Sequence, residues 1–191
     1  ETVYTMRNKY ILLELNDKNE IRADVDITIE SLNIYDITNI NVKIDTGCPY
    51  TSIPAQKIGI SKNKAQQMKE IDCKNPKVQK RVSYGVNDTI EQKQRAKEEF
   101  KNGNFSSIKE ISFIHKGFEI SFDDIKIHQN QVSVSYDRTG NILIGMDILS
   151  KMDIHIGKSK ITNKTIMLAC PYEMINNEYY KALNEHFGLS A

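Results

Sequence analysis

Long apolar runs and cysteine are both scarce in this sequence of 191 residues. The longest unbroken apolar runs span only a few residues, so no segment is long enough to form a transmembrane helix. The first fifteen residues lack a charged segment followed by an apolar one, so we expect no signal peptide in the printed chain. Three cysteines, Cys48, Cys73 and Cys170, are odd in number and widely spaced, which argues against a disulfide framework and favours a reducing compartment such as the cytoplasm.

The residue patterns of several common sites are also missing. The sequence has no His-x-x-x-His or Cys-x-x-Cys spacing, and no Gly-rich phosphate loop. Its four histidines, His115, His128, His155 and His186, are scattered along the chain. We therefore predict no metal site and no cofactor. Cys48 lacks the surrounding signature of a cysteine-protease nucleophile.

A large excess of one charge is absent as well, since 26 Lys/Arg stand against 25 Asp/Glu. The balance is uneven along the chain: residues 57–101 carry 12 Lys/Arg against 6 Asp/Glu, and the remainder carries 14 against 19. A basic middle segment can bind nucleic acid. Its charges are mixed in sign and its aromatics are few, so we interpret it as a solvated helical insertion and do not expect nucleic acid as a partner.

Alternation of apolar and polar residues predicts strands on both sides of this segment. Residues 21–30 alternate well, and residues 40–44 alternate again directly before Asp45. We expect a hairpin at His115-Lys-Gly117. The later strands are expected at 108–114, 118–127, 132–136, 142–144, 154–156 and 165–168.

Helix signals fall in the middle and at the end of the chain. Ser61 is a candidate N-cap for one helix of the insertion, and Asp88 or Thr89 for a second. A final helix is expected to open at Pro171 and to end at Gly188. The chain is therefore interpreted as one mostly β lobe over residues 1–170, with a basic helical insertion at about 57–101 and a C-terminal helical appendage over 171–191.

The tripeptide Asp45-Thr46-Gly47 carries the chemistry. Alone it is weak, because about one chain in twenty-five of this length would contain it by chance. The apolar strand before it would hold the acid rigidly at its tip, while Gly47 allows a close backbone approach and Thr46 offers a hydroxyl. A second segment, 142–149, is an apolar strand that ends in Gly145 and enters a helix, a pattern suited to a backbone that crosses close to another loop.

Together these two segments resemble the retropepsin-like aspartic proteases, whose lobe carries an acid in an apolar-Asp-Thr-Gly turn beside a later apolar-apolar-Gly segment. The resemblance covers about residues 20–169 and implies a closed, mostly β lobe with helical insertions and a C-terminal helix. The family needs two carboxylates around one water, and this chain has one Asp-Thr-Gly, so a homodimer acting on a polypeptide is implied. The implied site residues are Asp45 as the catalytic acid, Thr46, Gly47 and Cys48 in the active turn, and Ile144 and Gly145 as its structural support.

Two further features bear on this resemblance. The segment Val82-Ser-Tyr-Gly-Val86 is similar to the flap of pepsin-like enzymes, so Tyr84 and Gly85 are candidate flap residues; the alternative is an ordinary strand with an exposed Tyr. Cys48 stands where the family usually has Ala or Ser. A thiol is a poorer hydrogen-bond donor than a hydroxyl, so we expect a pH optimum less acidic than that of pepsin-like enzymes.

The predicted function is that of an aspartic endopeptidase that is active as a homodimer. The first alternative is a catalytically inactive peptide- or protein-binding module on the same fold, which would bind peptides without cutting them. The second is a nucleic-acid-associated protein that uses the basic segment 57–101, which would show salt-dependent binding.

Overall fold

The computed structural model describes residues 9–84, 87–108 and 110–189. The strands are β1 (Ile11–Glu14), β2 (Ile21–Ile29), β3 (Ile34–Ile44), β4 (Ser52–Pro54), β5 (Lys80–Val82), β6 (Ile111–Phe122), β7 (Ile125–Ser135), β8 (Leu143–Ile144), β9 (Met152–Lys158) and β10 (Thr165–Pro171). The helices are α1 (Lys62–Lys74), α2 (Ile90–Lys101), α3 (Met146–Leu149) and α4 (Asn177–Phe187), with short 3-10 turns at Glu30–Leu32, Ala55–Ile58, Phe105–Ser107 and Tyr172–Met174.

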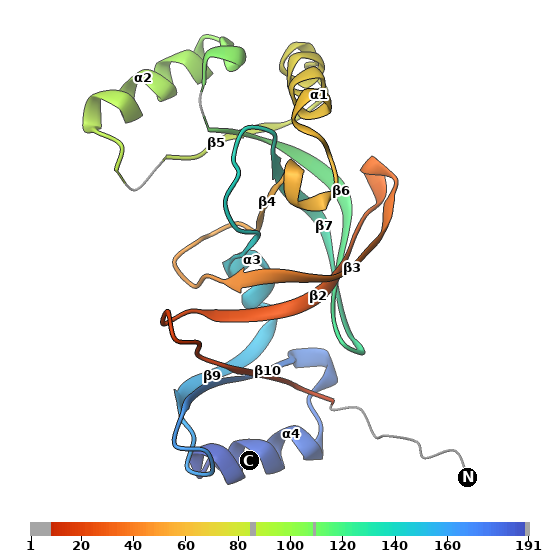
Figure 1. The fold of residues 1–191 in the computed structure, drawn as a ribbon, viewed down its shortest axis with the longest axis vertical. Coiled ribbons are helices and arrows are strands. Elements are labelled where there is room, and N and C mark those ends of the chain that lie inside the picture. The colour runs from red at the N-terminus through yellow and green to blue at the C-terminus, as the bar shows by residue number, and fades with distance from the viewer. Residues whose placement is uncertain (1–8, 85–86, 109, 190–191) are drawn as a thin grey trace.

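These strands form two sheets (Figure 1). The larger sheet has the strand order β2-β3-β8-β4-β7-β6-β5, and a further pairing between β2 and β6 closes it on itself. The smaller sheet has the order β1-β10-β9. The chain is therefore the mostly β, closed lobe with helical insertions and a C-terminal helix that the sequence predicts.

The alternation of apolar and polar residues in β2 fixes its pairing with β3, the strand that ends directly before Asp45. Ala23, Val25, Ile27 and Ile29 are buried, whereas Asp24 and Asp26, which alternate with them, are exposed. Full burial of one such aliphatic side chain contributes about 1.5–3 kcal/mol. A slip of one residue would turn all of these side chains to the opposite face, so the pairing of β2 with β3 is strongly specified.

The strands β6 and β7 correct one prediction. The hairpin expected at residues 115–117 is wrong, because β6 runs unbroken through them and the turn lies at Asp123-Asp124. Gly117 has a φ of +77°, so the strand bends there while keeping its register with β7. A Cβ at this position would lie 2.4 Å from the Cβ of Glu30. The glycine serves a close approach between two segments and does not mark a chain reversal.

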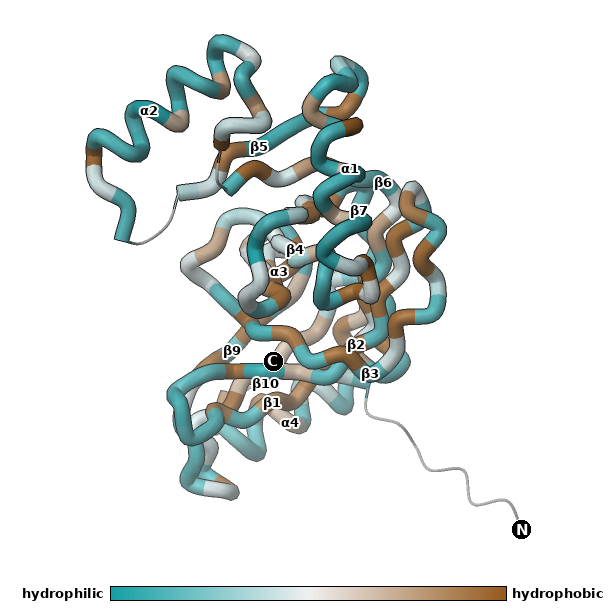
Figure 2. The backbone as a smooth tube through the Cα atoms, turned by 45° about the horizontal axis from the view of Figure 1, so that its top comes forward, coloured by the Kyte–Doolittle hydropathy of each residue, from teal (hydrophilic) through white to brown (hydrophobic). Residues whose placement is uncertain are grey.

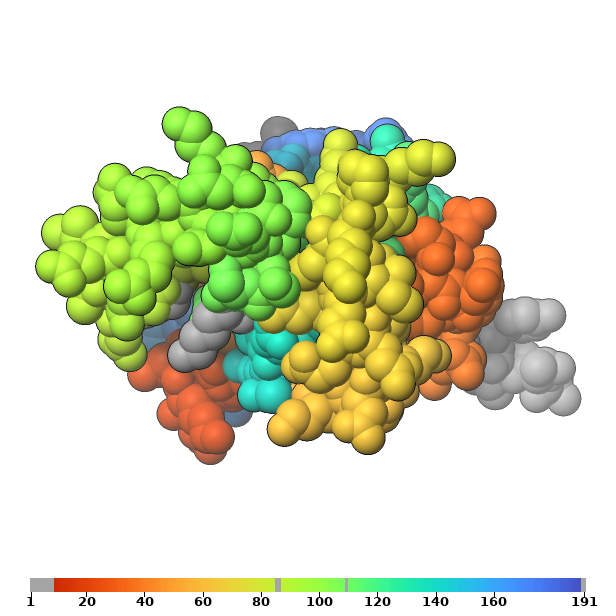
Figure 3. All heavy atoms as spheres, turned by 90° about the horizontal axis from the view of Figure 1, so that it is seen from above, coloured from red at the N-terminus to blue at the C-terminus, as the bar shows by residue number. Residues whose placement is uncertain are grey.

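The basic insertion forms a layer at one end of the lobe and covers much of that end when it is seen from above (Figure 3). Ser61 caps α1, and Thr89 caps α2 through a capping box, so both predicted caps are confirmed. α1 reaches the core through the buried Ala65. α2 buries none of its described residues and is largely hydrophilic (Figure 2). The ring of Phe100, near its C-terminal end, packs against the ring of Phe105, with 5.4 Å between the ring centroids.

The C-terminal helix packs against the smaller sheet of its own chain. Pro171 ends β10, and α4 begins only at Asn177, after the N-cap Asn176, whose side chain accepts a hydrogen bond from Tyr179 N–H. Gly188 ends the helix in the left-handed conformation, as predicted. The buried side chains between this helix and β10 are Ile166, Leu168, Cys170, Tyr179, Ala182 and Leu183.

Candidate active site

The Asp45 side chain lies directly after β3, in a turn that hydrogen bonds hold in place. Ile44 is buried, Asp45 is half-buried, and Thr46 and Gly47 are exposed. The Asp45 carboxylate accepts a hydrogen bond from Gly47 N–H (Oδ1···N 3.0 Å), and Asp45 N–H donates to the carbonyl of Ile144 (2.9 Å). The turn therefore presents an oriented carboxylate at the surface of the lobe.

The segment 142–149 runs alongside this turn. β8 pairs in parallel with the end of β3, and Ile144 lies opposite Ile44. Gly145 then comes so close to the turn that an added Cβ would lie 2.6 Å from the carbonyl oxygen of Cys48. Met146 N–H donates to that same carbonyl (2.8 Å). The close backbone approach expected at Gly145 is present, and a residue without a side chain permits it.

Gly145→Ala is expected to lower the free energy of unfolding by about 1–3 kcal/mol. The added methyl group would meet backbone atoms of Cys48 and Tyr50 at 2.6–2.9 Å, and backbone atoms move less readily than a flexible side chain. Chemical denaturation measures the loss. Gly157→Ala is the control, because its Cβ would meet the Phe187 ring at 3.4 Å, an ordinary contact. Equal losses in the two variants would contradict the assignment.

Thr51 and Asp147 form a second brace that sequence reasoning missed. Thr51 is fully buried and donates to Asp147 Oδ1 from its backbone N–H (2.9 Å) and from its hydroxyl (2.7 Å). The same hydroxyl accepts a hydrogen bond from Gly145 N–H (3.1 Å). Asp147 lies in the first turn of the short helix α3. It also joins the loop after Asp45 to the segment that runs beside it.

Cys48 is held as a neutral thiol. Its Sγ donates to the carbonyl of Tyr50 (2.9 Å), so the proton of the thiol points along the loop. Burial raises the pKa of Cys48, and the negative charge of Asp45 raises it further. A cysteine nucleophile reacts as the thiolate. This environment therefore opposes a nucleophilic role for Cys48, in agreement with the missing signature.

The structure places the candidate flap residue Tyr84 within the insertion, next to α2. Its side chain is 37% exposed, and Lys97 Nζ of α2 lies 5.8 Å from the centre of its ring. Tyr84 lines a groove of about 410 Å³ together with residues of α2 such as Gln92 and Arg95. Gly85, the other candidate flap residue, lies outside the described residues.

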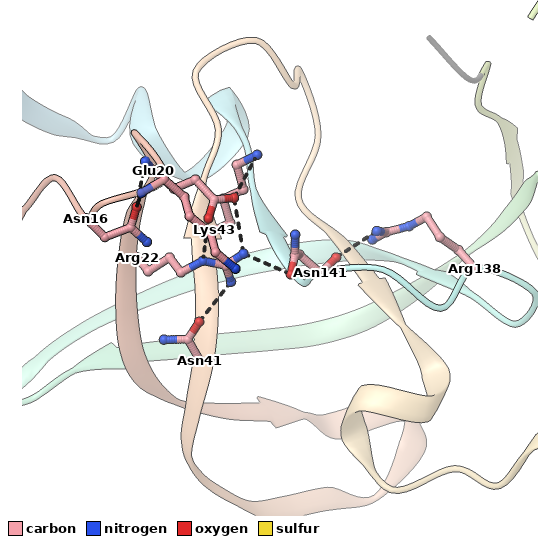
Figure 4. Close-up of polar contacts among 8 residues, drawn as sticks. Asn16, Glu20, Arg22, Asn41, Lys43, Arg138 and Asn141 are labelled. Atoms are coloured by element: carbon pink, nitrogen blue, oxygen red, sulfur yellow. Dashed lines mark hydrogen bonds and ion pairs between the residues drawn. The ribbon is translucent and has the colours of Figure 1, made fainter. Parts of the chain in front are cut away.

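A cluster of polar side chains ties β2 to the loop that leads into β8 (Figure 4). Arg22 Nη2 donates to Glu20 Oε2 (3.2 Å) and to Asn141 Oδ1 (3.1 Å). The hydrogen bond from Arg22 holds the pKa of Glu20 below its usual range, which preserves this ion pair into acidic solution. Arg138 donates to the carbonyl of Asn141 (2.7 Å) and to a carbonyl of β4 (3.0 Å). The loop 137–141 is thus held from two sides.

All four histidines have polar contacts of their own, His128 with Glu119 and His155 with Asp153, each at 3.1 Å. His115 Nε2 lies 2.8 Å from the hydroxyl of Tyr136, and His186 Nδ1 lies 2.7 Å from the hydroxyl of Ser159. Among the described residues, no group of three or more His, Cys, Asp or Glu could hold a metal ion. In the same part of the chain, no helix has the length and apolar character needed to cross a membrane.

Comparisons with known proteins give likenesses of fold alone. No family model matches the chain, and no curated protein matches it. Among solved structures, a retropepsin-like aspartic protease from Rickettsia conorii is similar at 13% identity, over 84% of this chain and 92% of that one, with a TM-score of 0.46. EIAV protease, solved in complex with the inhibitor HBY-793, is similar at 14% identity, over 71% and 89% of the two chains, with a TM-score of 0.35. By its own architecture, a closed β lobe with an Asp-Thr-Gly turn braced by the segment 142–149, this chain has the retropepsin-like fold that its sequence predicts.

Proposed function

We propose that this chain is an aspartic endopeptidase that works as a homodimer, with Asp45 of each subunit facing a shared water. The orientation of the Asp45 carboxylate, set by Gly47 N–H and by the pairing of β3 with β8, is the observation that carries the proposal. In such a pair one carboxylate takes a proton from the water, while the other, protonated, polarises the scissile carbonyl. The water then attacks the carbonyl carbon of the peptide bond.

The need for a second chain follows from the number of acids. The sequence contains Asp-Thr-Gly once, and the chemistry needs two carboxylates. A two-fold axis would bring two copies of the same turn together. The exposure of Thr46 and Gly47 supports this arrangement, because that part of the turn is open on the single chain.

Cleavage of a peptide library tests the proposal, with and without an inhibitor that mimics the tetrahedral transition state. We expect cleavage that the inhibitor blocks, and a dimer by sedimentation at the concentrations that give activity. Peptide binding by a protein that stays monomeric and cuts nothing would instead favour the inactive binding module. We also propose that the chain works in a reducing compartment, because its three cysteines are free thiols.

Cys48→Ser is expected to shift the acid limb of the pH–activity profile to lower pH. The Cys48 thiol donates to the carbonyl of Tyr50, and the expected effect requires the serine hydroxyl to turn from that carbonyl toward Asp45. A hydroxyl is a stronger donor than a thiol, and a hydrogen bond from it to the carboxylate favours the ionised form, so the general base persists in more acidic solution. The profile of kcat/KM against pH measures the shift. Cys73→Ser is the control, because Cys73 lies on α1, outside the turn. A profile of Cys48→Ser that matches the wild type would contradict the expected role of this position.

A further inference from the structure

A groove of about 360 Å³ adjoins the loop that carries Asp45. Tyr50, at the end of that loop, forms one wall, and Asp147, the partner of Thr51, lies at another. Ligand sites for whole small molecules span about 300–1,000 Å³, so this groove has room for one or two amino-acid side chains. The remaining lining residues are Arg81, Ile114, Gln129, Asn130, Gln131, Val132, Ser133 and Lys151.

Arg81 is held in this groove by contacts on two sides. Its guanidinium lies 3.5 Å from the centre of the Tyr50 ring, and its Nη1 donates to the hydroxyl of Ser133 (2.7 Å). β5 carries Arg81 and pairs with β6, so the backbone at this position is fixed as well. A guanidinium has five N–H donors in a rigid plane, and the Ser133 contact uses one of them. The group is therefore oriented before any ligand arrives.

The charges around the groove favour an anionic group. Arg81 and Lys151 are the two cations of its lining, and Asp147 is its one carboxylate. Asp147 Oδ1 accepts from Thr51 and from Ile148 N–H, and its Oδ2 accepts from Gln129 Nε2 (2.7 Å), so that carboxylate is already engaged. Lys151 Nζ donates to the backbone carbonyl of His128. This contact does not neutralise the positive charge of Lys151, because its acceptor is not a carboxylate.

We propose that this groove is a substrate subsite that binds an acidic side chain of the peptide, with Arg81 as the residue that recognises it. This inference rests on the proposed function, because it places the acidic residue a few positions from the bond that the Asp45 pair would cut. An arginine and a carboxylate can form two parallel charge-assisted hydrogen bonds, and the Tyr50 ring holds the plane of the guanidinium for them. A Gln or Asn side chain in the peptide carries no charge, so it cannot form this charge-assisted pair with Arg81.

Cleavage of matched peptides that carry Glu or Gln at each position in turn tests this subsite. We expect wild type to prefer Glu over Gln by about tenfold in kcat/KM at one position. Arg81→Met keeps much of the stem and should reduce this preference to near unity, while Arg81→Lys should retain part of it. Lys62→Met, at the exposed start of α1, removes one positive charge away from the groove and should leave the preference unchanged. Thermal melting of each variant reports on its fold.

Binding measurements on the Asp45→Asn protein separate failure of this inference from failure of the proposed function. If that protein binds the Glu peptide more tightly than the Gln peptide, and Arg81→Met removes the difference, the subsite stands even if no peptide is ever cut. Cleavage without any acidic preference, or a preference that survives in folded Arg81→Met, would overturn the subsite and leave the endopeptidase intact. Equal binding of both peptides would overturn it as well.

Discussion

Asp45→Asn is expected to reduce kcat/KM for peptide cleavage by about 10⁴-fold, the upper end of what general acid–base catalysis contributes. In a homodimer the substitution removes both the base that activates the water and the acid that polarises the carbonyl. The turn itself should survive, because the Asn side-chain oxygen can still accept the hydrogen bond from Gly47 N–H. We therefore expect an unchanged melting temperature together with the lost activity.

Asp36→Asn is the matched control, since Asp36 is an exposed acid on the same strand β3. Mixing supplies a second check: an excess of Asp45→Asn subunits should suppress the activity of wild-type subunits, because mixed dimers carry only one carboxylate at the site. Full activity of Asp45→Asn would end the proposal. Undiminished wild-type activity in the mixture would contradict the shared site.

Local signals in the sequence predicted the parts of the fold that depend on neighbouring residues. Ser61 and Thr89 cap their helices because a cap needs only a side-chain oxygen and the next three residues. The hairpin predicted at Gly117 was wrong because the local sequence does not show why a glycine is there. A glycine is equally compatible with a turn and with a close approach by a distant residue, here Glu30. The start of β3 at Ile34 was also missed, because this stretch of the strand is largely exposed and carries little apolar alternation.

In the candidate site as well, local signals identify some residues, whereas contacts between distant segments cannot be predicted. Asp45 and Gly145 could be singled out because each closes an apolar strand and carries a residue type with few other uses there. The contact of Arg81 with Tyr50 and that of Thr51 with Asp147 could not, because each joins residues far apart in the chain. The strand order of the larger sheet brings these pairs together, because β4 lies between β8 and β7, and β6 joins β7 to β5. For Asp147, the sequence offers only its position two residues after Gly145 as a signal.

Asp147→Ala is expected to lower the free energy of unfolding by about 3 kcal/mol or more. It would leave the backbone N–H and the hydroxyl of Thr51 without their acceptor, and each unsatisfied buried donor costs about 1–3 kcal/mol. Activity should fall with it, since Thr51 joins the loop after Asp45 to Gly145. Asp147→Asn keeps one acceptor oxygen and should lose about 1 kcal/mol. Chemical denaturation and the peptide assay measure the two effects.

Thr51→Val separates this brace from a general effect of a lost charge. The valine has nearly the same shape, and its backbone N–H can still donate to Asp147, but its side chain can neither donate to Asp147 nor accept from Gly145 N–H. It should therefore destabilise the protein by about 1–3 kcal/mol. Because the two residues share a hydrogen bond, the double variant Thr51→Val with Asp147→Ala should lose less than the sum of the single losses, by about 0.5–3 kcal/mol. Strict additivity would mean that Asp147 acts on stability by a route other than Thr51, and the loop after Asp45 would then need a different anchor.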